Sequence, residues 1–153
     1  MHTVNHSFAA RVRSFVSVAL LGGFASFALS GCTSEDVLTV KHNDARKANG
    51  LPALWRDSGA MEVWAKRHSQ EMAAKGALFH TSPLTNYSWP AGWKILGENV
   101  GVVGNDDMDA MFNAFMNSPA HRANILNRAF THFAIGCAKD GAGRTWCTVG
   151  FEG

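Results

Sequence analysis

The sequence has little net charge, few cysteines and no apolar run long enough to cross a membrane. Lys and Arg number 14, Asp and Glu number 12, and no basic run is interleaved with aromatic residues. We therefore expect no nucleic-acid partner. The uncharged run over residues 15–30 has about 16 residues, short of the roughly 20 that a transmembrane helix needs. No Ser, Cys or Thr lies in a recognisable nucleophile motif, which argues against covalent catalysis.

The first 31 residues have the pattern of an export signal. Arg11 and Arg13 precede the apolar run and no acid accompanies them, which is typical of a secretory signal peptide. The run ends in Leu29-Ser30-Gly31-Cys32, which resembles a bacterial lipoprotein lipobox. That resemblance implies cleavage before Cys32 and acylation (palmitate) of its thiol, so that the chain is anchored to the cell envelope, at the outer membrane if there are two. The alternative is an ordinary cleavage site beside an unrelated cysteine.

We therefore divide the chain into three parts. Residues 1–31 are the signal peptide, residues 32–36 are the lipidated N-terminus with a short tether, and residues 37–153 are one domain. Loss of Arg11 and Arg13 leaves 12 basic and 12 acidic residues, so the mature chain is formally neutral. Its length suffices to bury roughly two-thirds of the surface of the unfolded chain.

The two remaining cysteines flank a predicted hairpin. Asp140-Gly141-Ala142-Gly143 is a strong turn signal between the apolar segments 130–138 and 144–152. A three-residue loop at this turn places Cys137 opposite Cys147. The same register pairs Ile135 with Val149 and Phe133 with Phe151. An exported chain with this register favours a Cys137–Cys147 disulfide, and two free core thiols are the alternative.

Upstream of the hairpin, three segments have helical periodicity. The first runs from Ser34 to Asn49-Gly50, the second from Asp57 or Ser58 to Lys75, and the third begins at Asp106 or Asp107. His68 lies on the apolar stripe of the second helix, and we interpret it as a packed histidine with a hydrogen bond to backbone. Residues 77–104 show no periodicity, and long irregular segments in small domains are usually functional.

Three fragments bring histidine or carboxylate together with turn residues. They are Phe79-His80-Thr81-Ser82-Pro83, Gly97-Glu98-Asn99 and the stretch from Ser118 to Leu126. Ser118 and Pro119 are suited to cap and begin a short helix that carries His121. The fragments thus offer two imidazoles and one carboxylate for a common site.

Five fragments in order resemble the motifs of the CAP superfamily, also called the SCP or PR-1-like domain. They are His42-Asn43-Asp44-Ala45-Arg46, Gly50-Leu51-Pro52-Ala53-Leu54 and the three fragments just described. The resemblance covers residues 37–153. It implies an α+β fold, an α-β-α sandwich with helices on both faces of a small antiparallel sheet. The early strands of that sheet are then expected within residues 77–104, near residues 94–103.

The resemblance also implies a cleft with two histidines and two glutamates. By motif, His80 and His121 match the histidines and Glu98 matches the first glutamate. The second glutamate is expected three residues before His121, where this chain has Ser118. The set is therefore incomplete.

Two neutral imidazoles and a carboxylate can hold Zn²⁺ or another divalent metal with one position left for water. Asn99 and Ser118 are candidates to orient the imidazoles. Loss of the second glutamate argues against efficient metal-assisted hydrolysis. We expect a membrane-anchored binding module whose cleft holds a metal and a lipid or peptide ligand. The alternatives are a weak metal-dependent hydrolase and a structural domain with a metal-free cleft.

Overall fold

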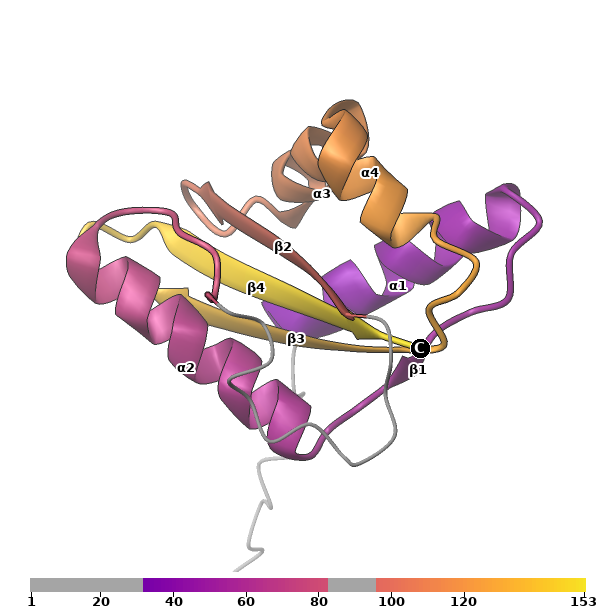
Figure 1. The fold of residues 1–153 in the computed structure, drawn as a ribbon. Helices are drawn as coiled ribbons and strands as arrows, with labels where there is room; N and C mark the ends of the chain where they lie inside the picture. Colours follow the sequence, from indigo (N-terminus) through magenta and orange to yellow (C-terminus); the bar gives the residue numbers. More distant parts are fainter. Residues whose placement is uncertain (1–31, 83–95) are drawn as a thin grey trace, which may run out of the picture. The chain divides into compact units, whose positions relative to one another are not determined.

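The computed structural model describes residues 32–82 and 96–153. In these ranges the helices are α1 (Ser34–Ala48), α2 (Ala60–Lys75), α3 (Met108–Asn117) and α4 (Pro119–Ile125). The strands are β1 (Trp55–Arg56), β2 (Leu96–Val103), β3 (His132–Lys139) and β4 (Thr145–Glu152). They form one sheet in the order β1-β3-β4-β2 (Figure 1).

The helices cover both faces of this sheet. Helix α2 lies on β3 and β4 from one side, while α1, α3 and α4 lie on the other (Figure 1). Alternation along the strands separates the two layers, because successive side chains point to opposite faces. Phe133, Ile135 and Val149 pack with the helices on the side of α1, whereas Ala134 packs against Met61 and Trp64 of α2. The predicted α-β-α sandwich is confirmed.

One edge of the sheet differs from the prediction. The antiparallel pairs are β2–β4 and β3–β4, but β1 runs parallel to β3, with Trp55 opposite His132. The cause lies in α1, where the Asn43 side chain bonds both the N–H and the carbonyl of Leu54 at 2.9 and 3.3 Å. This clamp directs the returning chain along β3. Two residues are too few to show the alternation of apolar and polar side chains by which a strand is recognised in a sequence.

The helix ends follow local signals, with two changes from the prediction. Helix α2 begins at Ala60 rather than at Asp57 or Ser58, with Gly59 as its N-cap residue. Thr33 caps α1, because Thr33 and Asp36 form a reciprocal capping box. Ser118 precedes α4 without a side-chain capping bond. Its N–H instead bonds to the carbonyls of Ala114 and Phe115, so Ser118 ends α3. The predicted ending of α2 at Gly76 is confirmed, since Gly76 has φ 65°.

The hairpin has the predicted register and disulfide. Cys137 lies opposite Cys147 in β3 and β4, and the two are bonded. At the turn the Asp140 carboxylate accepts hydrogen bonds from the Trp146 indole, the Arg144 N–H and guanidinium, and the Ala142 N–H. These bonds, the indole foremost, lower the pKa of Asp140 to about 2.

The start of the chain bears on the predicted membrane anchor. The predicted signal peptide falls outside the described residues. Cys32 is exposed and unpaired, and only Thr33 separates it from α1. Across residues 32–82 and 96–153, no helix combines the length and hydropathy that a membrane span requires.

Glu152, at the end of β4, is an unusual buried carboxyl. Its side chain is inaccessible to solvent, and neither carboxyl oxygen has a hydrogen-bond partner among the described residues. Burial, and then the negative charge of Asp57, raises the pKa of Glu152 to about 7. Between pH 4.5 and 7 the folded state therefore holds a proton that the unfolded chain releases. Glu152 must destabilise the fold as the pH rises through this window.

Glu152→Gln is expected to remove this pH dependence. At pH 8 the variant should be more stable than the wild type by about 3 kcal/mol, and at pH 4.5 the two should be nearly equal. Urea unfolding at both pH values measures the difference, with Glu71→Gln on the exposed face of α2 as the control. Buried His42, whose pKa burial lowers to about 4, has the opposite pH dependence but is present in both proteins. An identical response to pH in variant and wild type would refute the assignment.

Candidate functional site

Glu98 lies at the centre of the predicted cleft. Strand β2 places it opposite Gly150 of β4, and its side chain is only 1% exposed. Its Oε1 lies 3.1 Å from Nδ1 of His80 and 3.5 Å from Nε2 of His68. The Thr81 N–H donates to both carboxylate oxygens, at 3.3 and 3.2 Å. The structure thus brings two of the three predicted cleft residues, His80 and Glu98, into contact.

These contacts keep Glu98 ionised. Burial opposes its charge, but the hydrogen bond and positive charge of His68, the Thr81 N–H and the charge of His80 lower its pKa overall. Burial likewise disfavours the charged form of His68, yet the hydrogen bonds to Glu98 and to the Phe79 carbonyl raise the pKa of His68. The result is a buried carboxylate beside an imidazole that favours its protonated form.

His68 was predicted as a packed histidine with a backbone hydrogen bond, and this is confirmed. It is 2% exposed, stacks on Trp64 and lies 2.9 Å from the Phe79 carbonyl through Nε2. Because a carbonyl oxygen only accepts, Nε2 carries the proton. Its contact with Glu98 was not predicted. This contact makes His68 a support of the cleft as well as a core residue.

His121 approaches from α4. Its ring lies edge-on to Phe115, with 5.2 Å between the ring centroids. Burial lowers the pKa of His121, and the positive charge of His80 lowers it further. His121 is therefore held in its neutral form at pH 7.

Two asparagines fasten α4 to β2. Asn99 donates through Nδ2 to the carbonyl of His121 at 3.0 Å. Asn124 donates to the carbonyl of Glu98 at 3.2 Å and to Oδ1 of Asn99 at 2.9 Å. Asn99 thus positions the backbone that carries His121. Over the described ranges, the Ser118 hydroxyl makes no hydrogen bond to either imidazole.

Sequence reasoning did not identify Thr81 and Asn124 as parts of this network. Thr81 acts through its backbone N–H, which leaves no trace in residue type. Asn124 follows His121 by three residues, so both lie on one side of α4. This spacing is the feature of the sequence from which a role for Asn124 beside His121 could have been predicted.

The described part of the cleft has few side chains that could bind a metal ion. The part of the chain that the structure describes contains no group of three or more His, Cys, Asp or Glu side chains arranged around a common metal position. The carboxylate of Glu98 is already engaged by His68, His80 and Thr81. Among the predicted cleft residues that the structure describes, this leaves Nε2 of His80 and the ring of His121 as nitrogen donors. Two donors fit a metal that keeps several waters.

Comparisons with known proteins agree with the fold. The model of the CAP family, described as the cysteine-rich secretory protein family, matches residues 40–151. The YkwD protein of Bacillus subtilis (strain 168) is 33% identical over 106 residues, which are 65% of this chain and 40% of that protein. The chain thus spans less than half the length of this relative.

Two solved structures share the fold at low identity. An outer surface protein of Borrelia burgdorferi has a TM-score of 0.67 at 18% identity, covering 78% of this chain and 91% of that one. An extracellular protein of Bacillus anthracis that contains an SCP domain has a TM-score of 0.64 at 24% identity, covering 78% of this chain and 40% of that one. The family match spans α1 to β4, and the same segments carry the cleft residues. The chain belongs to the CAP family of cysteine-rich secretory proteins.

Proposed function

We propose that this protein is an exported binding module, anchored to the cell envelope through Cys32, whose cleft holds one divalent metal between His80 and His121. A lipid or peptide ligand then binds at this cleft. The observation that supports the metal most strongly is the 3.1 Å contact between Nδ1 of His80 and the buried Glu98 carboxylate. Metal-binding histidines commonly donate their second ring N–H to a carboxylate in this way.

The contact with Glu98 fixes the tautomer of His80. An ionised carboxylate only accepts hydrogen bonds, so Nδ1 of His80 must carry the proton. The lone pair is then on Nε2, which is the nitrogen left to bind a metal. The lowered pKa of His121 likewise favours the neutral imidazole that a metal needs. Glu98 is thus a positioning residue for His80.

The same donor set favours binding over catalysis. Catalytic zinc sites usually have three protein ligands and a nearby general base. Here the family's second glutamate is Ser118, and Glu98 is committed to neighbouring side chains. A bound Zn²⁺ would supply Lewis acidity. The described chain places no further carboxylate among the cleft contacts to take a proton from bound water.

The location of the protein is part of this proposal. The lipobox resemblance at Cys32 is supported by the exposure of this cysteine at the very start of the folded domain. Two proteins that share the fold are an outer surface protein and an extracellular protein. With only Thr33 between the anchor and α1, the domain would lie directly against the membrane surface.

Zinc titration by calorimetry tests the metal site. The protein is the domain of residues 31–153, which forms its own compact unit, with Cys32→Ser to remove the lipid and the free thiol. We expect micromolar or tighter binding that His80→Ala or His121→Ala abolishes. Glu98→Gln should weaken binding by about 10-fold or more, because it disturbs the orientation of His80. His132→Ala on β3 is the control for loss of an imidazole elsewhere, and circular dichroism confirms folding.

No heat of binding from a folded wild type would contradict the metal site. The contacts of Glu98 with Thr81 and His80 would then serve only to tie the 79–82 segment to β2. Binding that survives both histidine substitutions would place the metal elsewhere.

A further inference from the structure

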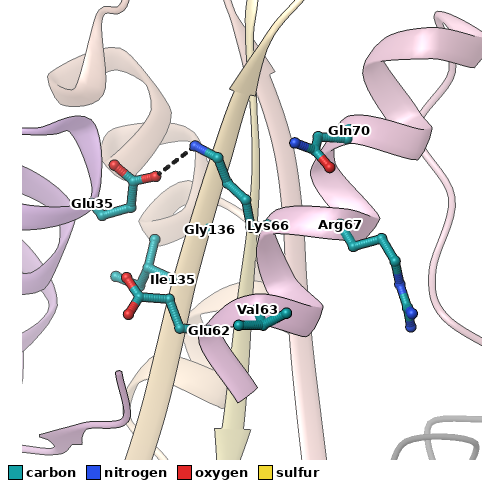
Figure 2. A pocket seen from close by; sticks show the side chains of 8 residues that line it. All are labelled: Glu35, Glu62, Val63, Lys66, Arg67, Gln70, Ile135 and Gly136. Atoms are coloured by element: carbon teal, nitrogen blue, oxygen red, sulfur yellow. Dashed lines mark hydrogen bonds and ion pairs between the residues drawn. The ribbon is translucent and has the colours of Figure 1, made fainter. Parts of the chain in front are cut away.

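A second concave site lies at the opposite edge of the sheet from the cleft. It is a groove of about 500 Å³ between α1 and α2, with β3 at its floor (Figure 2). Glu35 of α1 forms one wall, Val63 and Lys66 of α2 are on the other, and Ile135 and Gly136 lie between them. The cleft residue Glu98 belongs to β2, the other edge strand. The groove is therefore separate from the proposed metal site.

The groove continues the line of β1. Within residues 32–82 and 96–153, strand β1 pairs only with the first two residues of β3, His132 and Phe133, and the chain then turns away into α2. The N–H groups of Trp55 and Asp57 bond to the carbonyls of Thr131 and Phe133 at 3.0 and 2.8 Å. Odd-numbered residues of β3 therefore direct their backbone groups toward this edge. Beyond Phe133, no strand among the described residues pairs with that edge.

A side chain takes the place of the missing strand. The N–H of Cys137 donates to Oε1 of Glu35 at 3.0 Å, where a neighbouring strand would offer a carbonyl oxygen. The same Glu35 oxygen lies 3.3 Å from Nζ of Lys66, so the ion pair bridges the groove (Figure 2). Burial opposes the charge of Glu35, but its backbone hydrogen bonds and Lys66 lower its pKa overall. Inward-pointing charges of this kind keep a free edge from pairing indiscriminately.

Three elements next to the free edge, α1, β1 and α2, each carry an exposed apolar side chain. Val63 of α2 is 69% exposed, and Trp55 of β1 is 75% exposed. Val40 of α1 is 59% exposed and lies one turn from Asn43, which clamps the residue before Trp55. Of these side chains, Val63 lines the groove itself, and tryptophan residues such as Trp55 are enriched at protein interfaces.

We propose that this groove binds an extended peptide segment of a partner protein, which adds to β3 as a strand beyond the end of β1. A carbonyl of the peptide replaces Glu35 at the Cys137 N–H, and Glu35 turns outward while keeping its ion pair with Lys66. Alternate side chains of the peptide pack on Val63 and toward Trp55. Main-chain hydrogen bonds of this type give affinity with little dependence on sequence.

The residues that line the groove indicate which class of ligand it can bind. An acyl chain offers no polar atom to the Glu35–Lys66 ion pair that crosses the groove, and burying a charged pair under an apolar chain is costly. A second copy of the domain cannot pair edge to edge here, because Ile135 is fully buried and Cys137 is 3% exposed between the two helices. A single extended segment is narrow enough to enter and carries the complementary backbone groups.

The test uses a blocked peptide with alternating residues, acetyl-Lys-Val-Thr-Val-Thr-Val-Lys-amide, titrated into the ¹⁵N-labelled domain with the disulfide intact. We expect amide shifts in residues 135–139 and around Val63 at millimolar peptide, and none in residues 97–99. Glu35→Gln should bind the peptide at least threefold more tightly, because the neutral amide competes less well for the Cys137 N–H. Val63→Lys should weaken binding about 10-fold, while Leu78→Lys, at an exposed site beyond α2, should not.

Three outcomes would overturn the proposal. One is the absence of shifts in residues 135–139 for both the wild type and Glu35→Gln. Another is equal binding of a peptide whose central valine is proline, which cannot donate to a strand. The third is dimerisation in ultracentrifugation that Val63→Lys abolishes, since the occupant would then be a second copy.

Discussion

Gly136→Ala is expected to unfold the domain or detach α2 from the sheet. An alanine Cβ at this position would lie 2.1 Å from the backbone N of Lys66 and 2.5 Å from the carbonyl carbon of Ala65. Backbone atoms of a packed helix cannot turn aside as a flexible side chain can. The Ser69 hydroxyl also holds α2 down, through a 2.7 Å bond to the Gly136 carbonyl and contact with Thr148. We expect a loss of at least about 3 kcal/mol in the free energy of unfolding.

Gly141→Ala is the matched control for this variant. Gly141 lies in the turn between β3 and β4, and a Cβ there would meet nothing within 4 Å. Urea unfolding of the two variants should therefore give a large loss for Gly136→Ala and a small change for Gly141→Ala. Equal and small effects would mean that α2 packs less closely on β3 than the structure shows.

Arg46→Met is expected to cost about 4 kcal/mol of stability. Arg46 is fully buried, and its guanidinium donates only to backbone carbonyls in the described structure. The acceptors are Pro52 at 2.8 Å, Ile125 and Asn127 at 2.9 Å, and Phe130 at 3.3 Å. One side chain thus holds the segment after α1 and the segment between α4 and β3. A methionine fills similar volume but leaves these carbonyls without a donor.

The variant Arg46→Lys separates packing from hydrogen bonding. An ammonium group cannot reproduce the planar fork of donors, so we expect a loss nearly as large as with methionine. Arg128→Met, at an exposed position on the same connection, should change stability little. A stability loss for Arg46→Met no larger than that for Arg128→Met would show that the carbonyls find water instead.

The elements that sequence predicts well are those with both a repeating pattern and a local stop signal. Helix α2 has its apolar stripe and Gly76, and the β3–β4 hairpin has its Gly-rich turn and two apolar strands. In both cases local preference and tertiary packing agree. Strand β1 has neither signal, because two residues paired at an edge depend wholly on the Asn43 clamp. At Ser118 a local signal is present but is not followed. Its residue type favours capping the start of α4, yet its N–H ends α3 instead.

The residues of the candidate site also differ in whether the sequence carries a signal for them. His80, Glu98 and His121 were found because their fragments match family motifs, and the structure places Glu98 against His80. The supports of this arrangement are the Thr81 N–H and the His68 ring. A backbone donor has no residue signature, and His68 belongs to an ordinary core stripe. Their roles follow only from the way that β2 brings Glu98 under α2.

In the proposed metal site, His80 and His121 hold the metal while Glu98 orients His80. The most direct measurement is anomalous diffraction at the zinc edge from crystals of the domain grown with zinc. We predict one strong peak bonded to Nε2 of His80 and to the ring of His121, with waters as its other ligands and Glu98 still bonded to Nδ1 of His80. A peak coordinated by the Glu98 carboxylate would contradict the assigned roles, and no peak at the two imidazoles would contradict the metal site itself.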